Sequence, residues 1–138
     1  HDRDDEEVPK DVTSVTIHPS ATQIKNQAFL DCYELEIVTL HKGVTSIGEC
    51  AFQECVNLRY INLHESSVET IDDYAFRRCE SLEGVELPPS LKRINRGAFN
   101  RCKSLIIIDL SACPLLQEIG NGAFWRCTSL MAAYFPKS

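Results

Sequence analysis

An Ala-Phe dipeptide recurs five times along the chain, and its spacing constrains the fold more than any other feature of the sequence. The copies are 23, 24, 23 and 25 residues apart, at Phe29, Phe52, Phe76, Phe99 and Phe124. A Cys follows each Phe by three residues, a Leu follows each Cys by three, and an Ile precedes each Ala by four. Offsets kept in register over every copy identify an internal repeat.

A repeat unit of about 23 residues cannot bury its own apolar side chains, whereas stacked units bury equivalent residues in continuous columns. Each unit contains a Leu-x-x-(Val/Ile)-x-Leu segment, for example Leu82, Val85 and Leu87. As a strand, this segment points its Val/Ile and second Leu inward and the residues between them outward. We therefore predict a mostly β solenoid of about five to six turns, each of 23–25 residues. A curved parallel sheet should form its concave side, and short 3-10 or irregular segments its convex side.

The two ends of the chain differ from the repeats between them. We expect residues 11–138 to form one solenoid domain and residues 1–10 to form a poorly ordered leader, because the leader is densely acidic. The C-terminal segment 130–135 stops inside a predicted strand and has no polar cap. Such an end indicates either truncation or end-to-end pairing with another chain.

Two segments give the repeat a family likeness. Residues 44–55 read Val-Thr-Ser-Ile-Gly-Glu-Cys-Ala-Phe-Gln-Glu-Cys, and Leu87-Pro88-Pro89 is followed by Ser-Leu-Lys-Arg-Ile. Over about residues 11–136 the chain resembles the BspA-type leucine-rich repeats of bacteria and protists. The resemblance implies a leucine-rich repeat solenoid with a role in binding or adhesion. It brings no catalytic residues.

Five of the seven cysteines recur once per turn. Zinc sites favour Cys pairs two to four residues apart, so this column is better explained as buried free thiols that pack as small apolar groups. Cys50 and Cys113 lie outside the column, and we expect them to be the more reactive thiols. Reduced cysteines favour a reducing compartment, whereas the resemblance includes many surface proteins, and the compartment stays open.

The outward columns of the predicted concave sheet are the candidate binding surface. Its apolar members are Ile37, Tyr60, Ile107 and Tyr134. Its polar members are Thr39, Asn62, Glu86 and Asp109. Exposed aromatic and aliphatic side chains on a sheet are typical of a protein contact, so we predict a protein or peptide ligand. The alternative is that these residues only form cross-strand pairs between turns.

Three of the four histidines share one repeat position at the end of the predicted strand: His18, His41 and His64. Parallel stacking would place these imidazoles roughly 5 Å apart. Neighbouring imidazoles can share a transition metal or respond to pH. The alternative is that His only tolerates an exposed strand end.

A second column, two residues after each Phe, changes the sign of its charge along the chain. Its members are Asp31, Glu54, Arg78, Arg101 and Arg126. The neighbouring basic residues are Arg77, Arg93, Arg96 and Lys103. This basic end is a candidate for docking an acidic partner or the acidic end of a second copy. The alternative is a charged face that serves solubility.

Other function classes are disfavoured. A net charge of -6 and a pI near 5.2 argue against nucleic-acid binding, which requires a dense basic face. No apolar run approaches the ~20 residues of a membrane helix. Because no nucleotide-binding or hydrolase motif occurs, we predict no enzyme and no cofactor. We therefore predict a non-catalytic protein- or peptide-binding scaffold. The alternatives are a structural, self-associating or adhesion segment of a longer solenoid, and a metal-binding surface.

Overall fold

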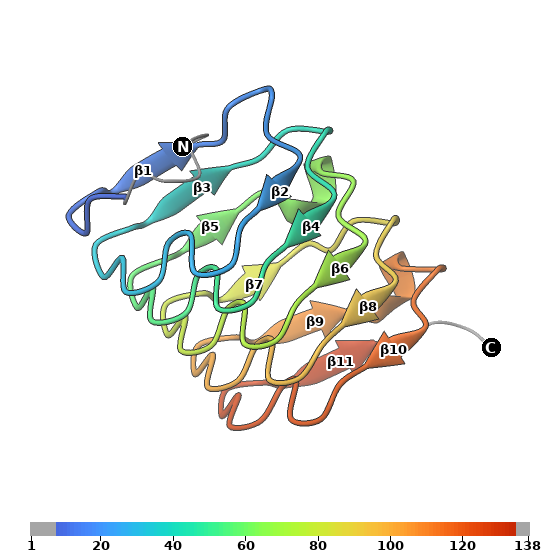
Figure 1. The fold of residues 1–138 in the computed structure, drawn as a ribbon. Helices are drawn as coiled ribbons and strands as arrows, with labels where there is room; N and C mark the ends of the chain where they lie inside the picture. The colour runs from blue at the N-terminus through green and yellow to red at the C-terminus, as the bar shows by residue number, and fades with distance from the viewer. Residues whose placement is uncertain (1–7, 135–138) are drawn as a thin grey trace.

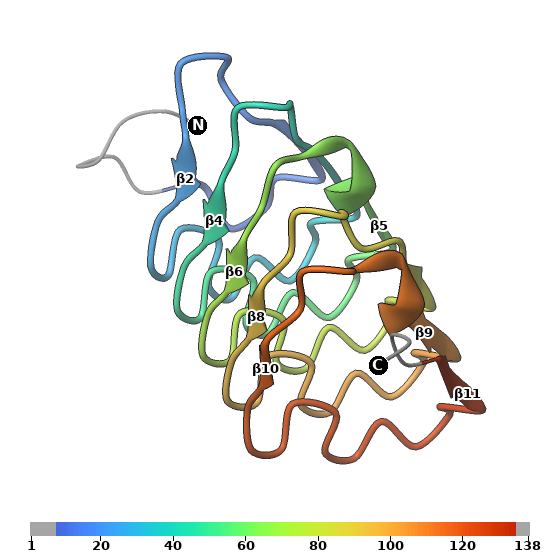
Figure 2. The ribbon, with the colours of Figure 1, turned by 90° about the vertical axis from the view of Figure 1, so that its right-hand side faces the viewer.

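The computed structural model describes residues 8–134, which stack as successive turns that contribute strands to two rows (Figure 1). The first row holds β1 (Ser14–Thr16), β3 (Ile37–Thr39), β5 (Tyr60–Ile61), β7 (Gly84–Val85), β9 (Ile107–Asp109) and β11 (Ala132–Tyr134). The second row holds β2 (Gln23–Ile24), β4 (Ser46–Ile47), β6 (Thr70–Ile71), β8 (Arg93–Ile94) and β10 (Glu118–Ile119). The 3-10 helices η1 (Leu63–Glu65) and η2 (Leu110–Ala112) follow β5 and β9. Figure 2 shows the turns lying one behind another.

The predicted β solenoid is confirmed, and its strands pair in parallel. In β3, Val38 is buried while Ile37 and Thr39 are exposed, as the alternation of the repeat predicts. The predicted leader falls mainly on residues 1–7, which lie outside the described residues. Val8 packs against the core, and Lys10 Nζ donates to the carbonyl of Leu30 in the first turn.

The second row is a continuous five-stranded sheet in the order β2-β4-β6-β8-β10, where the sequence suggested only short or irregular segments. Its register aligns the repeat isoleucines, from Ile24 through Ile47 and Ile71 to Ile94. These isoleucines are buried, whereas Ile119 of β10 is 40% exposed. The Ile that precedes Ala by four residues therefore occupies a core-facing strand position in each of the first four turns.

The first row is divided into two sheets, β1-β3-β5 and β7-β9-β11. Asn62 ends β5, because its side chain takes over the pairing with the previous turn. Its Oδ1 accepts from the Leu40 backbone N–H at 2.7 Å, and its Nδ2 donates to the Leu40 carbonyl at 3.1 Å. The chain then turns into η1 instead of continuing the strand.

The wide part of the core is a column of phenylalanine rings. Neighbouring centroids from Phe29 to Phe99 are 5.2 Å apart, and the Phe99–Phe124 pair is 5.6 Å apart. Interplanar angles do not exceed 9°. The small alanines beside them, Ala51, Ala75 and Ala98, are fully buried. The Ala-Phe pair therefore supplies a site of close approach followed by a ring that stacks on the turns before and after it.

The cysteine column has a polar role that the sequence did not reveal. The Sγ atoms of Cys55, Cys79 and Cys102 each donate to the Phe carbonyl of the preceding turn, at 3.1–3.2 Å. Cys127 does the same at 3.1 Å. These thiols fill the core and satisfy backbone acceptors at the same time, which a purely apolar side chain of this size cannot do.

Backbone hydrogen bonds connect the Ala-Phe segments of consecutive turns, and they all run in one direction. In each pair of turns, three N–H groups of the earlier turn donate to carbonyls of the later one; Phe52, for example, donates to Ala75 at 2.7 Å. The two donors that flank Phe have a positive φ, as for Tyr74 (57°) and Arg78 (61°). The charge-changing column therefore coincides with a left-handed backbone position, which is rare for residues other than glycine.

Candidate binding surface

The outward side chains of β1, β3, β5, β7, β9 and β11 form one surface, the strand face, which corresponds to the predicted concave side. Ile37 and Tyr60 lie side by side on it, because β3 and β5 pair Ile37 with Tyr60. They are 37% and 50% exposed. Two adjacent apolar side chains thus stand in solvent on one sheet.

The other two apolar candidates lie on the second sheet of the same row. Ile107 is 44% exposed and pairs with Gly84 on one side and Ala132 on the other. Tyr134 is 53% exposed and pairs with Asp109. Gly84 leaves open space at its position, since no atom lies within 4 Å of where its Cβ would stand. The strand face therefore has two apolar patches, Ile37–Tyr60 and Ile107–Tyr134, with a gap at Gly84 between them.

The polar candidates divide into accessible and inaccessible residues. Thr39, Glu86 and Asp109 are exposed, although Asp109 Oδ1 already accepts from the Ser111 backbone N–H at 3.0 Å. Asn62 was predicted to face outward, and this is wrong, because only 4% of it is exposed. The strand alternation predicted an exposed side chain, but the amide is buried because it forms two hydrogen bonds with the Leu40 backbone.

The histidine column is engaged locally. Both ring nitrogens of His41 contact backbone groups: Nδ1 accepts from the Gly43 N–H at 3.0 Å, and Nε2 donates to the His18 carbonyl at 2.9 Å. His18 Nδ1 contacts Ser20 Oγ at 2.7 Å. His64 lies between Glu65 and Glu86, 3.5 Å from a carboxylate oxygen of each. Within residues 8–134, no group of three or more His, Cys, Asp or Glu side chains is arranged to hold a metal ion.

All seven cysteines are free, including the five of the column that the sequence predicted to be free thiols. Cys113 was expected to be a reactive thiol, and this is wrong: its side chain is fully buried, with Sγ donating to the Pro88 carbonyl at 3.5 Å. Burial raises the pKa of Cys113 to about 11. Cys50 is partly exposed, and burial together with Glu49 raises the pKa of its thiol as well.

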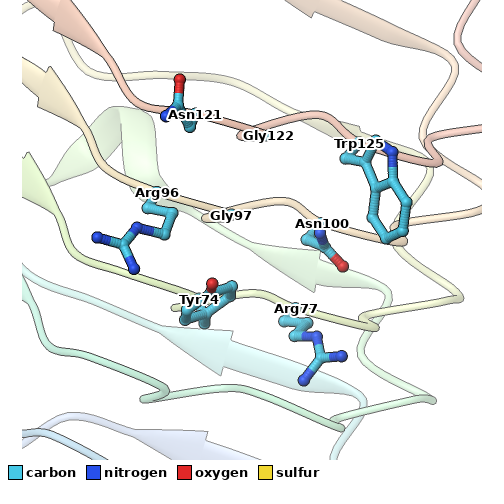
Figure 3. Close-up of a pocket in the computed structure, with 8 residues that line it drawn as sticks. All are labelled: Tyr74, Arg77, Arg96, Gly97, Asn100, Asn121, Gly122 and Trp125. Carbon is cyan, nitrogen blue, oxygen red and sulfur yellow. The ribbon is translucent and has the colours of Figure 1, made fainter.

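A groove of about 410 Å³ lies on the side of the Ala-Phe segments, away from the strand face (Figure 3). It is lined by Tyr74, Arg77, Arg96, Gly97, Asn100, Asn121, Gly122 and Trp125. These residues come from three repeat positions in three consecutive turns: two before Ala, one before Ala and one after Phe. The groove was not predicted from the sequence. The available signal was the pair Gly97 and Gly122. Both occupy the repeat position before Ala, where the preceding turn has Tyr74, and the missing side chains leave space for the groove.

No helix within residues 8–134 is long and apolar enough to cross a membrane. Several apolar side chains near the last described turn are exposed to solvent. Among them, Trp125 is 49% exposed and Met131 is 84% exposed.

Comparison with known proteins agrees with this geometry. Residues 9–131 match six copies of the BspA type leucine-rich repeat region. No curated protein matches the sequence. A leucine-rich repeat protein of T. pallidum is 31% identical, with a TM-score of 0.84 over 91% of this chain and 59% of that one.

Two further solved structures are similar. A leucine-rich cell surface protein of Faecalibacterium prausnitzii is 28% identical, with a TM-score of 0.61 over 88% of this chain and 38% of its own. The pneumococcal vaccine antigen PcpA is 19% identical and shares the fold, with a TM-score of 0.75 over 96% of this chain and 33% of its own. The chain thus spans less than two thirds of each of these three proteins. Leucine-rich repeats generally serve as non-catalytic scaffolds for protein interactions. The six matched repeats show that the chain belongs to the BspA-type leucine-rich repeat family.

Proposed function

We propose that this solenoid is a non-catalytic scaffold that binds a protein or peptide through the strand face. The observation that carries the proposal is the adjacent pair Ile37–Tyr60, which is exposed on a rigid sheet. Ile107 and Tyr134 extend the apolar surface onto the neighbouring sheet. Large, stiff aromatic side chains lose little entropy on contact and often dominate binding energy, so Tyr60 is the expected centre of the interface.

A partner is first captured with a photocrosslinking amino acid placed at Thr39, an exposed position of the strand face. The same amino acid at Thr22, which is exposed before β2 in the other row, is the control for nonspecific capture. A partner of the strand face crosslinks at Thr39 and not at Thr22.

The affinity of that partner is then measured for Tyr60→Ala and Ile107→Ala. Tyr33→Ala is a matched control, because Tyr33 is 49% exposed and Tyr60 50%, but Tyr33 lies outside the strand face. Truncation of a central Tyr is expected to weaken binding about 30-fold. If both strand-face variants bind as wild type does, or if Tyr33→Ala loses as much affinity, the strand face is not the interface.

The second candidate is self-association through the last described turn. It is favoured by the exposure of Ile119, Trp125 and Met131 in that part of the chain. Sedimentation velocity over a wide range of concentration tests this candidate. Association that weakens in Met131→Ser or Ile119→Ser supports it, whereas a strict monomer at high concentration counts against it.

A further inference from the structure

The groove beside the Ala-Phe segments is rich in unpaired positive charge. Figure 3 shows Arg77 and Arg96 on either side of the Tyr74 ring. Within residues 8–134, neither guanidinium lies within ion-pair distance of a carboxylate, and the same is true of Arg101 and Arg126 next to the groove. Asp73 contacts the backbone of this cluster and not a guanidinium: its Oδ1 accepts from the Arg96 backbone N–H at 3.2 Å.

Three of these four arginines, Arg77, Arg101 and Arg126, lie against aromatic rings and not against acids. Arg77 Cζ lies 5.8 Å from the centroid of the Tyr74 ring. Arg126 and Arg101 lie 4.5 and 5.3 Å from the centroid of the Trp125 ring. Partial desolvation, followed by the charges of neighbouring arginines, lowers the pKa of Arg101. An anion at this place would relieve that mutual repulsion.

A buried amide oxygen provides an independent sign of a ligand. Asn100 lines the groove, is only 7% exposed, and its Oδ1 has no hydrogen-bond partner among the described residues. A buried acceptor without a partner is costly, and such atoms are rare in folded proteins. Because Oδ1 is itself buried, a rotation of the Asn100 side chain toward the groove would let it accept from an N–H or O–H donor that a ligand carries next to its negative charge.

We propose that this groove is a second binding site, distinct from the strand face, that takes a carboxylate-rich peptide segment of a protein partner. Carboxylates match the planar fork of Arg77 and Arg96, and the peptide N–H groups beside them supply the donor for Asn100 Oδ1. The chain as a whole carries a charge of -6, so its bulk charge repels anions and attraction depends on this local cluster.

The aromatic residues of the groove disfavour an acidic saccharide as the ligand. The Tyr74 ring packs against Gly97, where an added Cβ would stand only 2.4 Å from Cε1, and Arg77 covers the ring as well. The Trp125 ring contacts two guanidinium groups. A sugar would therefore have to compete with guanidinium groups for both rings. An extended peptide needs no such platform.

The test measures binding of acetylated, amidated hexaglutamate by titration calorimetry at low ionic strength, with hexaglutamine as the neutral control. Binding of hexaglutamate alone, weakening as salt is added, is the expected result. The Arg77→Gln/Arg96→Gln variant should weaken it about tenfold or more, because two charge-assisted contacts are lost. Arg93→Gln removes one positive charge, as each groove substitution does, from an exposed position on β8 and should leave binding within about twofold of wild type.

Two further variants define the site. Asn100→Leu removes the unpaired acceptor and is expected to weaken hexaglutamate binding, with a thermal melt confirming that the variant is folded. Tyr60→Ala should bind hexaglutamate as wild type does, because it alters only the strand face. Failure of either proposal can therefore be told apart from failure of the other.

Three results would overturn the assignment. Absence of hexaglutamate binding to wild type at low salt would refute the proposal entirely. Equal losses of hexaglutamate affinity in Arg93→Gln and in Arg77→Gln/Arg96→Gln would show that binding depends on overall charge and not on the groove. Tighter binding of an oligogalacturonate of the same charge would assign the groove to acidic saccharides.

Discussion

The phenylalanine column offers a quantitative test of how neighbouring turns stabilise each other. Phe76 stacks on Phe52 and Phe99, with both centroid distances 5.2 Å and interplanar angles of 9° and 3°. Phe76→Leu keeps most of the buried apolar volume but removes both ring–ring contacts. Each aromatic pair contributes about 0.5–1.5 kcal/mol beyond its buried area, so the substitution should cost about 1–3 kcal/mol from stacking alone.

Phe124→Leu is the matched control at the end of the column. Among the described residues, Phe124 stacks on one ring, that of Phe99 at 5.6 Å, and it is only partly buried. Its substitution should cost about half as much as that of Phe76, or less, because one pair is lost instead of two. Urea unfolding followed by circular dichroism gives both free energies, provided that the slope with denaturant is unchanged.

The difference in stability loss between Phe76→Leu and Phe124→Leu shows whether ring stacking or burial sets the energy. Equal losses at Phe76 and Phe124 would mean that burial of each ring, and not its contact with two neighbours, sets the energy. A further variant, Phe76→Ala, should cost about 3–5 kcal/mol, because it also leaves a cavity. A loss for Phe76→Ala no larger than that for Phe76→Leu would show that the column collapses around the deletion.

Three other predictions follow from the backbone and the buried polar groups. Asn62→Asp should cost more stability in urea unfolding than Asn62→Ala at neutral pH, because Asp cannot donate to the Leu40 carbonyl and buries a charge beside it; equal losses would contradict this. Gln27→Gly should raise the free energy of unfolding by about 1 kcal/mol, since Gln27 has a φ of 60°; a loss would show that its side chain contributes more than the strain costs. Burial raises the pKa of Cys79 and Cys102, so these thiols stay protonated in the folded chain above pH 9.0, where they ionise once unfolded. Stability present below pH 9 should therefore fall as the pH rises further, by about 1.4 kcal/mol per pH unit for each thiol. Thermal melts at pH 8 and 10 measure this loss, and a Cys79→Ala/Cys102→Ala variant that loses as much would assign it to other groups.

The parts of the fold that recur in every turn could be predicted from the sequence. Ile, Ala, Phe and Cys keep fixed offsets, and each occupies the same core position in successive turns, so the period alone identifies the solenoid. The continuous second sheet was not predictable in this way. Its strands are two residues long and exist because neighbouring turns pair, so no local pattern of alternation precedes them.

The binding surfaces were less accessible to sequence reasoning, because they depend on residues that break the repeat. Ile37, Tyr60 and Ile107 follow the strand alternation and are exposed as predicted. Asn62 satisfies the same alternation, yet its amide pairs with backbone and is buried. The groove depends on where Arg, Gly and Trp coincide across three turns, and that coincidence appears only when the turns are stacked in space.

The one-way backbone bonds between Ala-Phe segments give the molecule an electrical direction. Each N–H points toward the later turn, so partial positive charge accumulates toward the C-terminal end of the stack and partial negative charge toward the N-terminal end. The ionised side chains add to this in the same sense, since residues 8–69 carry four basic and eight acidic residues and residues 70–134 carry eight and seven. The solenoid is therefore an electric dipole along its stacking axis. A partner with separated charges that approaches within about a Debye length, roughly 8 Å at physiological salt, feels a torque that turns its acidic side toward the C-terminal turns before any contact forms.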